Sequence, residues 1–312
     1  MKTLFEKLTD RDEGICLYGI TPPKQATEPP ALAAIAQQQA ERIGSLRADG
    51  LILYDIQDES ERTKEPRPFP FLPTLSPEHY AKDHLRALQV PKIVYRAVTS
   101  DSRTTLAEWL AAVQASGERR FSVLVGAPSS QSSTGRLKLS DAYVLTRQCA
   151  PSLVLGGIAI AERHNRTFDE HHRMLAKMDH GCRFLVTQAV YDVTPMKSLL
   201  SDYALALDER GIQPIPIIVT FSPCGSARTL DFMKWLGISF PRWLENELRH
   251  SADILGESVT LAAGIFAELL DFARQKRIPL GINVESVSIR KTEIEASVEL
   301  FHTLRALINS GK

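Results

Sequence analysis

The sequence predicts an α/β protein whose chain, residues 1–312, forms a single (β/α)8 barrel domain, the TIM barrel. Three observations predict this fold. Short apolar runs alternate with helical segments eight times, and the length suits one barrel. No GxGxxG motif follows the first run. An open doubly wound sheet is the structural alternative, and the missing glycine motif favours the barrel.

The eight apolar runs are expected to be parallel strands buried on both faces, because their hydrophobicity is nearly continuous and rich in β-branched residues. They cover residues 15–20, 51–55, 92–98, 121–125, 152–158, 183–188, 215–220 and 280–287. Helical spacing predicts crossover helices at residues 30–47, 105–116, 139–147, 168–179 and 194–209. Residues 222–277 are longer than one crossover and hold two helical patterns, so the seventh βα unit is expected to carry an extra helix.

Composition and residue spacing bear on the partners, metal sites and cell compartment that we expect. The 37 Lys and Arg residues balance 37 Asp and Glu residues, so no overall charge would attract nucleic acid or an anionic membrane. The four cysteines have no zinc-type spacing, and the adjacent His171 and His172 face different directions on a helix, so no metal site is expected. No apolar stretch has the length of a signal peptide or a membrane span, so we expect a cytoplasmic protein.

In such a barrel, functional side chains gather at the C-terminal ends of the strands. Asp55 ends the second predicted strand and Glu285 lies near the end of the eighth, so they stand on either side of the first strand, about 4.8 Å from it. Burial in a barrel mouth raises the pKa of a carboxyl group, so both are candidate catalytic acids. Gln188, at the end of the sixth, can donate and accept hydrogen bonds and suits the edge of a heterocycle that does both.

Other strand-end residues are candidates for binding. Tyr18 and Phe221 lie near the ends of the first and seventh strands and are candidate substrate contacts. Gly126 and Ala127 form a tight turn whose backbone amides could bind a phosphate, although the turn lacks the GK[ST] of a P-loop.

The stretch from Leu175 to Asp192 resembles the methylenetetrahydrofolate reductase family. It contains a lysine, Asp-x-Gly, an apolar strand and then Thr-Gln, two hydrophobic residues, an aromatic residue and Asp, in the family's order. The order and spacing of motifs agree along nearly the whole chain. The supporting matches are Thr21-Pro22-Pro23-Lys24, Glu162-x-His164 and Pro241-x-Trp243-Leu244.

The resemblance implies a (β/α)8 barrel that binds FAD and uses NAD(P)H to reduce methylenetetrahydrofolate to methyltetrahydrofolate. By position, Gln188 resembles the family glutamine that recognises the pterin ring of folate. His164, Glu170 and Lys177 fall where the family holds the adenosine and phosphate part of FAD.

The sequence departs from the family's motifs at two positions that matter for the reaction. The family's catalytic glutamate, the general acid for a folate nitrogen, is Gly19 here, so Asp55 or Glu285 would have to supply the proton. The family's Arg-Gly-Asp loop is replaced by Val125-Gly126-Ala127, which removes charged contacts to the flavin ring and puts FAD binding in question. NAD(P)H could then deliver hydride directly to the folate.

Arg96 has two interpretations: it anchors a phosphate or the folate glutamate tail, or it pairs with Asp55. Three functions stay open: a one-carbon oxidoreductase, another folate-dependent reaction such as methyl transfer with a methyltransferase partner, and a non-catalytic folate- or flavin-binding protein. The sequence also leaves open whether the chain forms a homo-oligomer.

Overall fold

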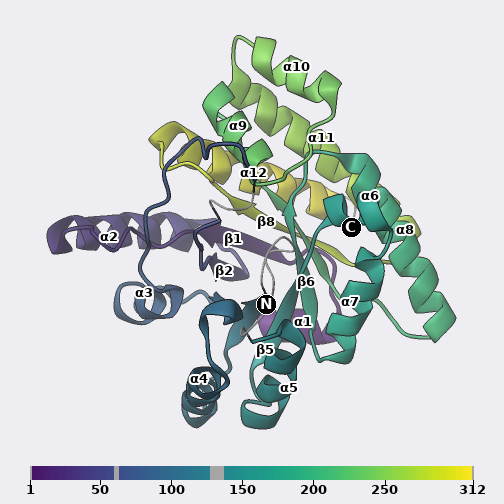
Figure 1. Cartoon of the computed structure of the whole chain (residues 1–312). Helices are drawn as coiled ribbons and strands as arrows, with labels where there is room; N and C mark the ends of the chain where they lie inside the picture. Colours follow the sequence, from purple (N-terminus) through teal and green to yellow (C-terminus); the bar gives the residue numbers. More distant parts are fainter. Residues whose placement is uncertain (1, 60–62, 127–136, 311–312) are drawn as a thin grey trace.

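The computed structural model describes residues 2–59, 63–126 and 137–310. It confirms the predicted barrel, because eight parallel strands pair in sequence order and β8 closes on β1 (Figure 1). The strands are β1 (Cys16–Ile20), β2 (Gly50–Leu53), β3 (Lys92–Ala97), β4 (Phe121–Val125), β5 (Val154–Ala159), β6 (Phe184–Ala189), β7 (Ile217–Phe221) and β8 (Leu280–Glu285). Each overlaps a predicted run, and β2 ends before Asp55.

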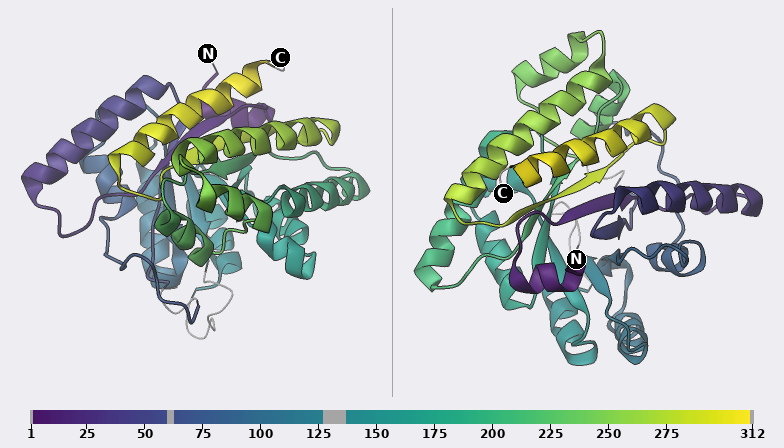
Figure 2. Two further views of the ribbon diagram at one scale, coloured as in Figure 1. Left: turned by 90° about the horizontal axis from the view of Figure 1, so that it is seen from above. Right: turned by 180° about the vertical axis from the view of Figure 1, so that it is seen from behind.

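Helices surround the strands as predicted. The outer layer consists of α2 (Pro29–Leu46), α3 (Pro77–Asp83), α4 (Arg103–Ala115), α5 (Leu139–Cys149), α6 (Ala161–Thr167), α7 (Glu170–Asp179), α8 (Val193–Arg210), α11 (Ile254–Gln275) and α12 (Lys291–Ser310), with a short 3-10 turn, η1 (Val98–Ser100), after β3. In Figure 2, α11 and α12 lie side by side over the strands that close the barrel. Helix α1 (Leu4–Asp10) precedes β1 and packs Leu4 and Leu8 against the interior residues Leu17 and Ile52.

The seventh βα unit differs from the prediction of one extra helix. Two helices, α9 (Ala227–Trp235) and α10 (Arg242–His250), come before the crossover helix α11. Gly237, with φ of 86°, and Pro241 separate α9 from α10, because the first residue takes a left-handed conformation and the second cannot continue a helix. The sequence shows two helical patterns over residues 222–277, and the structure has three helices there.

Alternation along each strand decides which side chains face the barrel interior. In β1, Leu17 packs with the interior residues, whereas Tyr18 packs with the outer layer of helices. In β8, the apolar residues at 280, 282 and 284 pack outward, so Asn283 and Glu285 point inward. The mouth of the barrel is therefore lined by alternate residues of the strand ends.

The connection from β2 to α3 is a long loop, and we call its residues 63–75 the mouth strap. Figure 1 shows the dark-blue chain of the strap passing near α9 and continuing to α3. Thr74 forms an antiparallel bridge with Lys24, and Trp235 of α9 donates from Nε1 to Glu65 O at 3.0 Å. The strap thus joins the loop after β1 to the seventh βα unit.

Within the described residues, no helix has both the length and the apolar character needed to cross a bilayer.

Candidate active site at the barrel mouth

Glu285 ends β8 and points into the barrel mouth. Burial raises the pKa of its carboxyl group to about 7, and a hydrogen bond from Tyr54 opposes part of this rise. The Tyr54 and Tyr95 rings meet edge to face, with centroids 4.9 Å apart, and form an apolar wall near the carboxyl group. At neutral pH such a carboxyl group is present in both protonation states and can release or accept a proton.

Gly19, where the resemblance to the methylenetetrahydrofolate reductase family implies a glutamate, is the direct neighbour of Glu285. The two residues are paired in the β1–β8 ladder. A Cβ atom at Gly19 would lie 2.8 Å from Tyr54 Cε2 and 3.2 Å from Asn283 Oδ1, so the Tyr54 ring uses the space that a side chain at position 19 would need. The carboxyl group beside position 19 is therefore that of Glu285, on the neighbouring strand β8.

A hydrogen-bonded chain supports Glu285. Asn283 donates from Nδ2 to the Tyr54 hydroxyl oxygen at 2.8 Å, and that hydroxyl group donates to the Glu285 carboxylate. Asn283 Oδ1 is buried without a hydrogen-bond partner in the described parts of the chain. Because a buried acceptor without a partner is unfavourable, a hydrogen-bond donor reaching this oxygen would stabilise the mouth.

Asp55 lies two residues beyond β2 and is engaged by the chain itself. Its Oδ2 atom accepts a hydrogen bond from Ala97 N at 2.8 Å, and its Oδ1 atom accepts one from Gln57 Nε2 at 2.8 Å. Burial raises the pKa of Asp55, while the hydrogen bond from Ala97 lowers it. One oxygen atom thus binds the end of β3 and the other binds the loop that follows β2, so the geometry favours Glu285 over Asp55 as the acid.

Arg96 faces away from the barrel interior, since its neighbour Tyr95 is an interior residue. Its guanidinium group donates to both carboxylate oxygens of Asp101, each at 2.8 Å, and lies 4.6 Å from the centroid of the Trp109 ring. The interpretation that Arg96 pairs with Asp55 is wrong, because Asp101 is the closer acid. Because its side chain points outward, Arg96 does not reach the barrel mouth and cannot anchor a folate tail there.

Tyr18 and Phe221 were predicted as substrate contacts, and the structure places both on the outer side of the barrel. The Tyr18 hydroxyl group forms a 2.6 Å hydrogen bond with Ser297 of α12, and Phe221 is fully buried against Phe266 of α11. Both predictions are wrong for the same reason. Strand alternation turns these side chains toward the helices.

Gln188 lies on β6 in phase with the interior residues Phe184 and Val186. It is half-buried, and its Nε2 atom donates to Leu236 O, one residue beyond α9, at 2.7 Å. Gln188 therefore extends from the end of β6 toward the seventh βα unit, at the same end of the barrel as Glu285.

Glu170 and Lys177 fix α7 against β5. Glu170 is fully buried, and its Oε1 atom accepts a hydrogen bond from Ile160 N at 3.2 Å. Lys177 Nζ donates to Ile158 O at 2.5 Å and lies 3.8 Å from Glu170 Oε1. Burial lowers the pKa of Lys177, and Glu170 opposes this effect. These polar groups contact the protein rather than an open surface.

The other predicted cofactor residues also do not provide a flavin site. His164 is fully buried, and its Nε2 atom lies 3.0 Å from Asp202 Oδ2. A Cβ atom at Gly126 would lie 3.3 Å from Leu139 Cβ, so this turn is already closely packed, and Ala127 lies outside the described residues. The residues that the structure describes do not fit FAD held in the way that the resemblance implies, and we derive no step through it.

Sequence reasoning did not assign a role to Tyr54, Tyr95 or Asn283. Asn283 precedes Glu285 by two residues, so strand alternation alone places both on one face. Assigning Tyr54 and Tyr95 to the same site requires the positions of β2, β3 and β8 in the closed barrel. Asp55, which follows Tyr54 in the chain, was predicted as a candidate acid, and Tyr54 was not.

The chain resembles a solved structure over almost its whole length. That structure is of an uncharacterized protein from Clostridium thermocellum that binds two copies of 5-methyl-5,6,7,8-tetrahydrofolic acid. The sequences are 44% identical, the TM-score is 0.86, and the match covers 97% of this chain and 99% of that chain. This chain belongs to the same family.

More distant structures share the fold alone. A GH10 endoxylanase from a sugarcane soil metagenome is 7% identical, with a TM-score of 0.52 over 96% of this chain and 98% of that chain. A GH113 beta-1,4-mannanase is 10% identical, with a TM-score of 0.53 over 96% and 99% of the two chains. No family model and no curated protein matches the chain.

Proposed function

We propose that the protein binds a reduced folate in the barrel mouth and acts on its one-carbon unit with Glu285 as the proton donor. The observation that carries the folate assignment is the full-length relative, 44% identical, that binds 5-methyl-5,6,7,8-tetrahydrofolic acid. The resemblance of residues 175–192 to the methylenetetrahydrofolate reductase family supports the same ligand class.

The polar groups of the mouth suit a pterin ring, whose edge presents both donors and acceptors. Gln188 would exchange its bond to Leu236 O for bonds to this edge, and the unpartnered Asn283 Oδ1 would accept from a ring donor. The rings of Tyr54 and Tyr95 would supply apolar contact for the heterocycle.

For the reaction, we propose reduction of methylenetetrahydrofolate with NAD(P)H as the direct hydride donor. The hydride adds to the methylene carbon, the bond from this carbon to one of its two nitrogen atoms breaks, and that nitrogen takes the proton of Glu285. The products are methyltetrahydrofolate and oxidised NAD(P). A carboxyl group whose pKa is about 7 keeps a large protonated fraction at neutral pH, as this step requires.

The test has two stages. Calorimetric titration with 5-methyltetrahydrofolate measures binding, and absorbance at the nicotinamide band then follows oxidation of NADH or NADPH in the presence of methylenetetrahydrofolate. We expect binding by the wild type and nicotinamide oxidation that Glu285→Gln abolishes. Asp55→Asn is the matched comparison, since it removes the other candidate carboxylate and should retain most turnover.

Each outcome has a defined meaning. Absence of folate binding would refute the whole proposal. Binding without nicotinamide oxidation would refute the reductase part and favour methyl transfer with a partner or binding alone. Loss of turnover in Asp55→Asn, with Glu285→Gln unaffected, would assign the acid to Asp55.

A further inference from the structure

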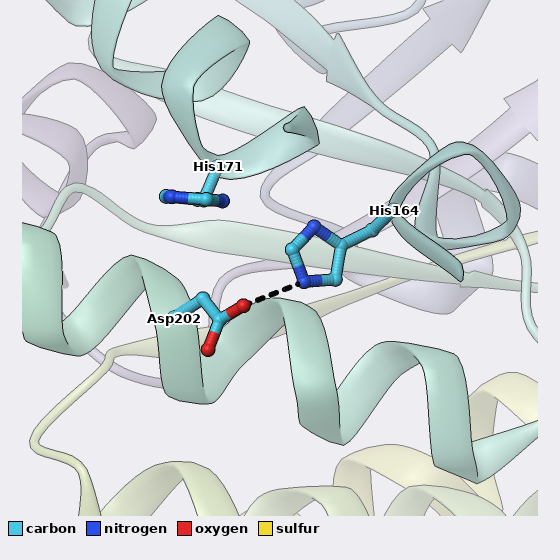
Figure 3. Close-up of side chains that lie close together, drawn as sticks. All are labelled: His164, His171 and Asp202. Atoms are coloured by element: carbon cyan, nitrogen blue, oxygen red, sulfur yellow. Dashed lines mark hydrogen bonds and ion pairs between the residues drawn. The ribbon is translucent and has the colours of Figure 1, made fainter. Parts of the chain in front are cut away.

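Three side chains of types that commonly bind metal ions come from three helices and lie close together on the flank of the barrel. His164 belongs to α6, His171 to α7 and Asp202 to α8, and one ligand atom of each lies within 4.8 Å of the other two. Figure 3 shows the three side chains converging on one space between the helices. The proposed folate chemistry uses none of these side chains.

We propose that His164, His171 and Asp202 bind a divalent transition-metal ion of the Zn²⁺ type. Two imidazoles and one carboxylate form a donor set that suits Zn²⁺ and its first-row neighbours. Zn²⁺ lies about 2.1 Å from its nitrogen and oxygen ligands, so two ligand atoms of a tetrahedral ion are about 3.4 Å apart. The 3.0 Å separation of His164 Nε2 and Asp202 Oδ2 is somewhat shorter than this value. The ligand atom of His171 lies within 4.8 Å of the other two, so a side-chain adjustment would bring it to the same ion.

An unpartnered nitrogen atom of His171 distinguishes this cluster from an ordinary ion pair. The buried Nδ1 atom of His171 has no hydrogen-bond partner in the described parts of the chain. A His164–Asp202 ion pair would explain two of the side chains, but it leaves His171 turned toward them without a bond. A metal ion would give the second imidazole a favourable contact as well.

The surroundings hold the cluster and leave it accessible. The His171 ring packs on the His172 ring with centroids 3.9 Å apart, which restricts its orientation. His171 and Asp202 are each half-buried, so an ion held there would keep a coordination position open to water. This site departs from the sequence expectation of no metal, which considered histidines on one helix, whereas these ligands come from three.

Metal titration of the metal-free protein, without folate, tests the proposal. Co²⁺ serves as the first probe because a low-coordinate cobalt site absorbs in the visible range, and Zn²⁺ should displace it. We expect one ion per chain for the wild type. His171→Gln and Asp202→Asn should each weaken the affinity by more than about tenfold, since loss of a supporting residue alone weakens metal sites by 10- to 100-fold.

His250→Gln is the matched control, because it removes an exposed histidine of α10, outside the three helices that carry the cluster, and it should keep wild-type affinity. Circular dichroism and thermal unfolding of each metal-free variant establish that it is folded, and two separate ligand variants guard against the failure of one. A wild type that binds no Co²⁺ or Zn²⁺, or ligand variants that bind as the wild type does, would overturn the proposal.

Discussion

Glu285→Gln is expected to change how the free energy of unfolding depends on pH. The carboxyl group of Glu285 has a pKa of about 7 in the folded protein, against an ordinary value of 4.5. Between these values the folded protein retains a proton that the unfolded chain has released, so the stability of the wild type falls as the pH rises through this window. The difference corresponds to at most about 3 kcal/mol, and residual solvent contact in the mouth lowers it toward about 2 kcal/mol.

Urea-induced unfolding at pH 5 and pH 8 measures this effect. The amide of Glu285→Gln resembles the protonated acid, so wild type and variant should have similar stability at pH 5. At pH 8 the wild type should have lost about 2 to 3 kcal/mol more than the variant, because other titrating groups are common to both. Tyr54→Phe removes a hydrogen bond that favours the ionised form and should move the window to higher pH. If wild type and Glu285→Gln lose the same stability between pH 5 and pH 8, Glu285 is not held protonated and cannot be the proton donor.

Three further predictions concern residues around the barrel. Gly19→Ala places a methyl group 2.8 Å from Tyr54 and should destabilise the protein by about 1 to 3 kcal/mol in chemical unfolding, with weaker binding of 5-methyltetrahydrofolate; unchanged stability and binding would contradict the packing described. Lys177→Met should lower stability by about 1 to 3 kcal/mol and leave folate affinity unchanged, because it removes one of the two cations beside the buried Glu170 and leaves Arg173; a lower affinity with full stability would point instead to a role in ligand binding. Tyr18→Phe removes one hydrogen bond to α12 and should cost about 1 kcal/mol of stability, and any loss of folate affinity would restore this residue to the site.

The strands could be predicted because each is a short apolar run between helical segments. The same property explains why the directions of Tyr18 and Phe221 could not be predicted. A parallel strand buried on both faces has apolar residues at every position, so inward and outward positions look alike in sequence. Asn283 and Glu285 are an exception among these strand residues. They are polar and two positions apart, so the sequence alone indicates that both lie on one face of their strand.

The supporting residues of the mouth required tertiary information. Tyr54 belongs with Glu285 only because β2 and β8 both flank β1, a relation set by closure of the barrel. The cluster of His164, His171 and Asp202 likewise depends on how three helices pack against one another. No spacing rule along the chain connects such residues.

Trp235 and Leu236 are consecutive in the chain, yet they hold two different parts of the barrel mouth. Trp235 donates to Glu65 O in the mouth strap, and Leu236 O accepts from Gln188. A ligand that takes the Gln188 amide frees Leu236 O, the carbonyl oxygen of the residue that follows Trp235. We therefore expect occupancy of the mouth to affect residues 63–75, and amide hydrogen exchange in the strap should change when folate binds, even at strap residues that do not contact it.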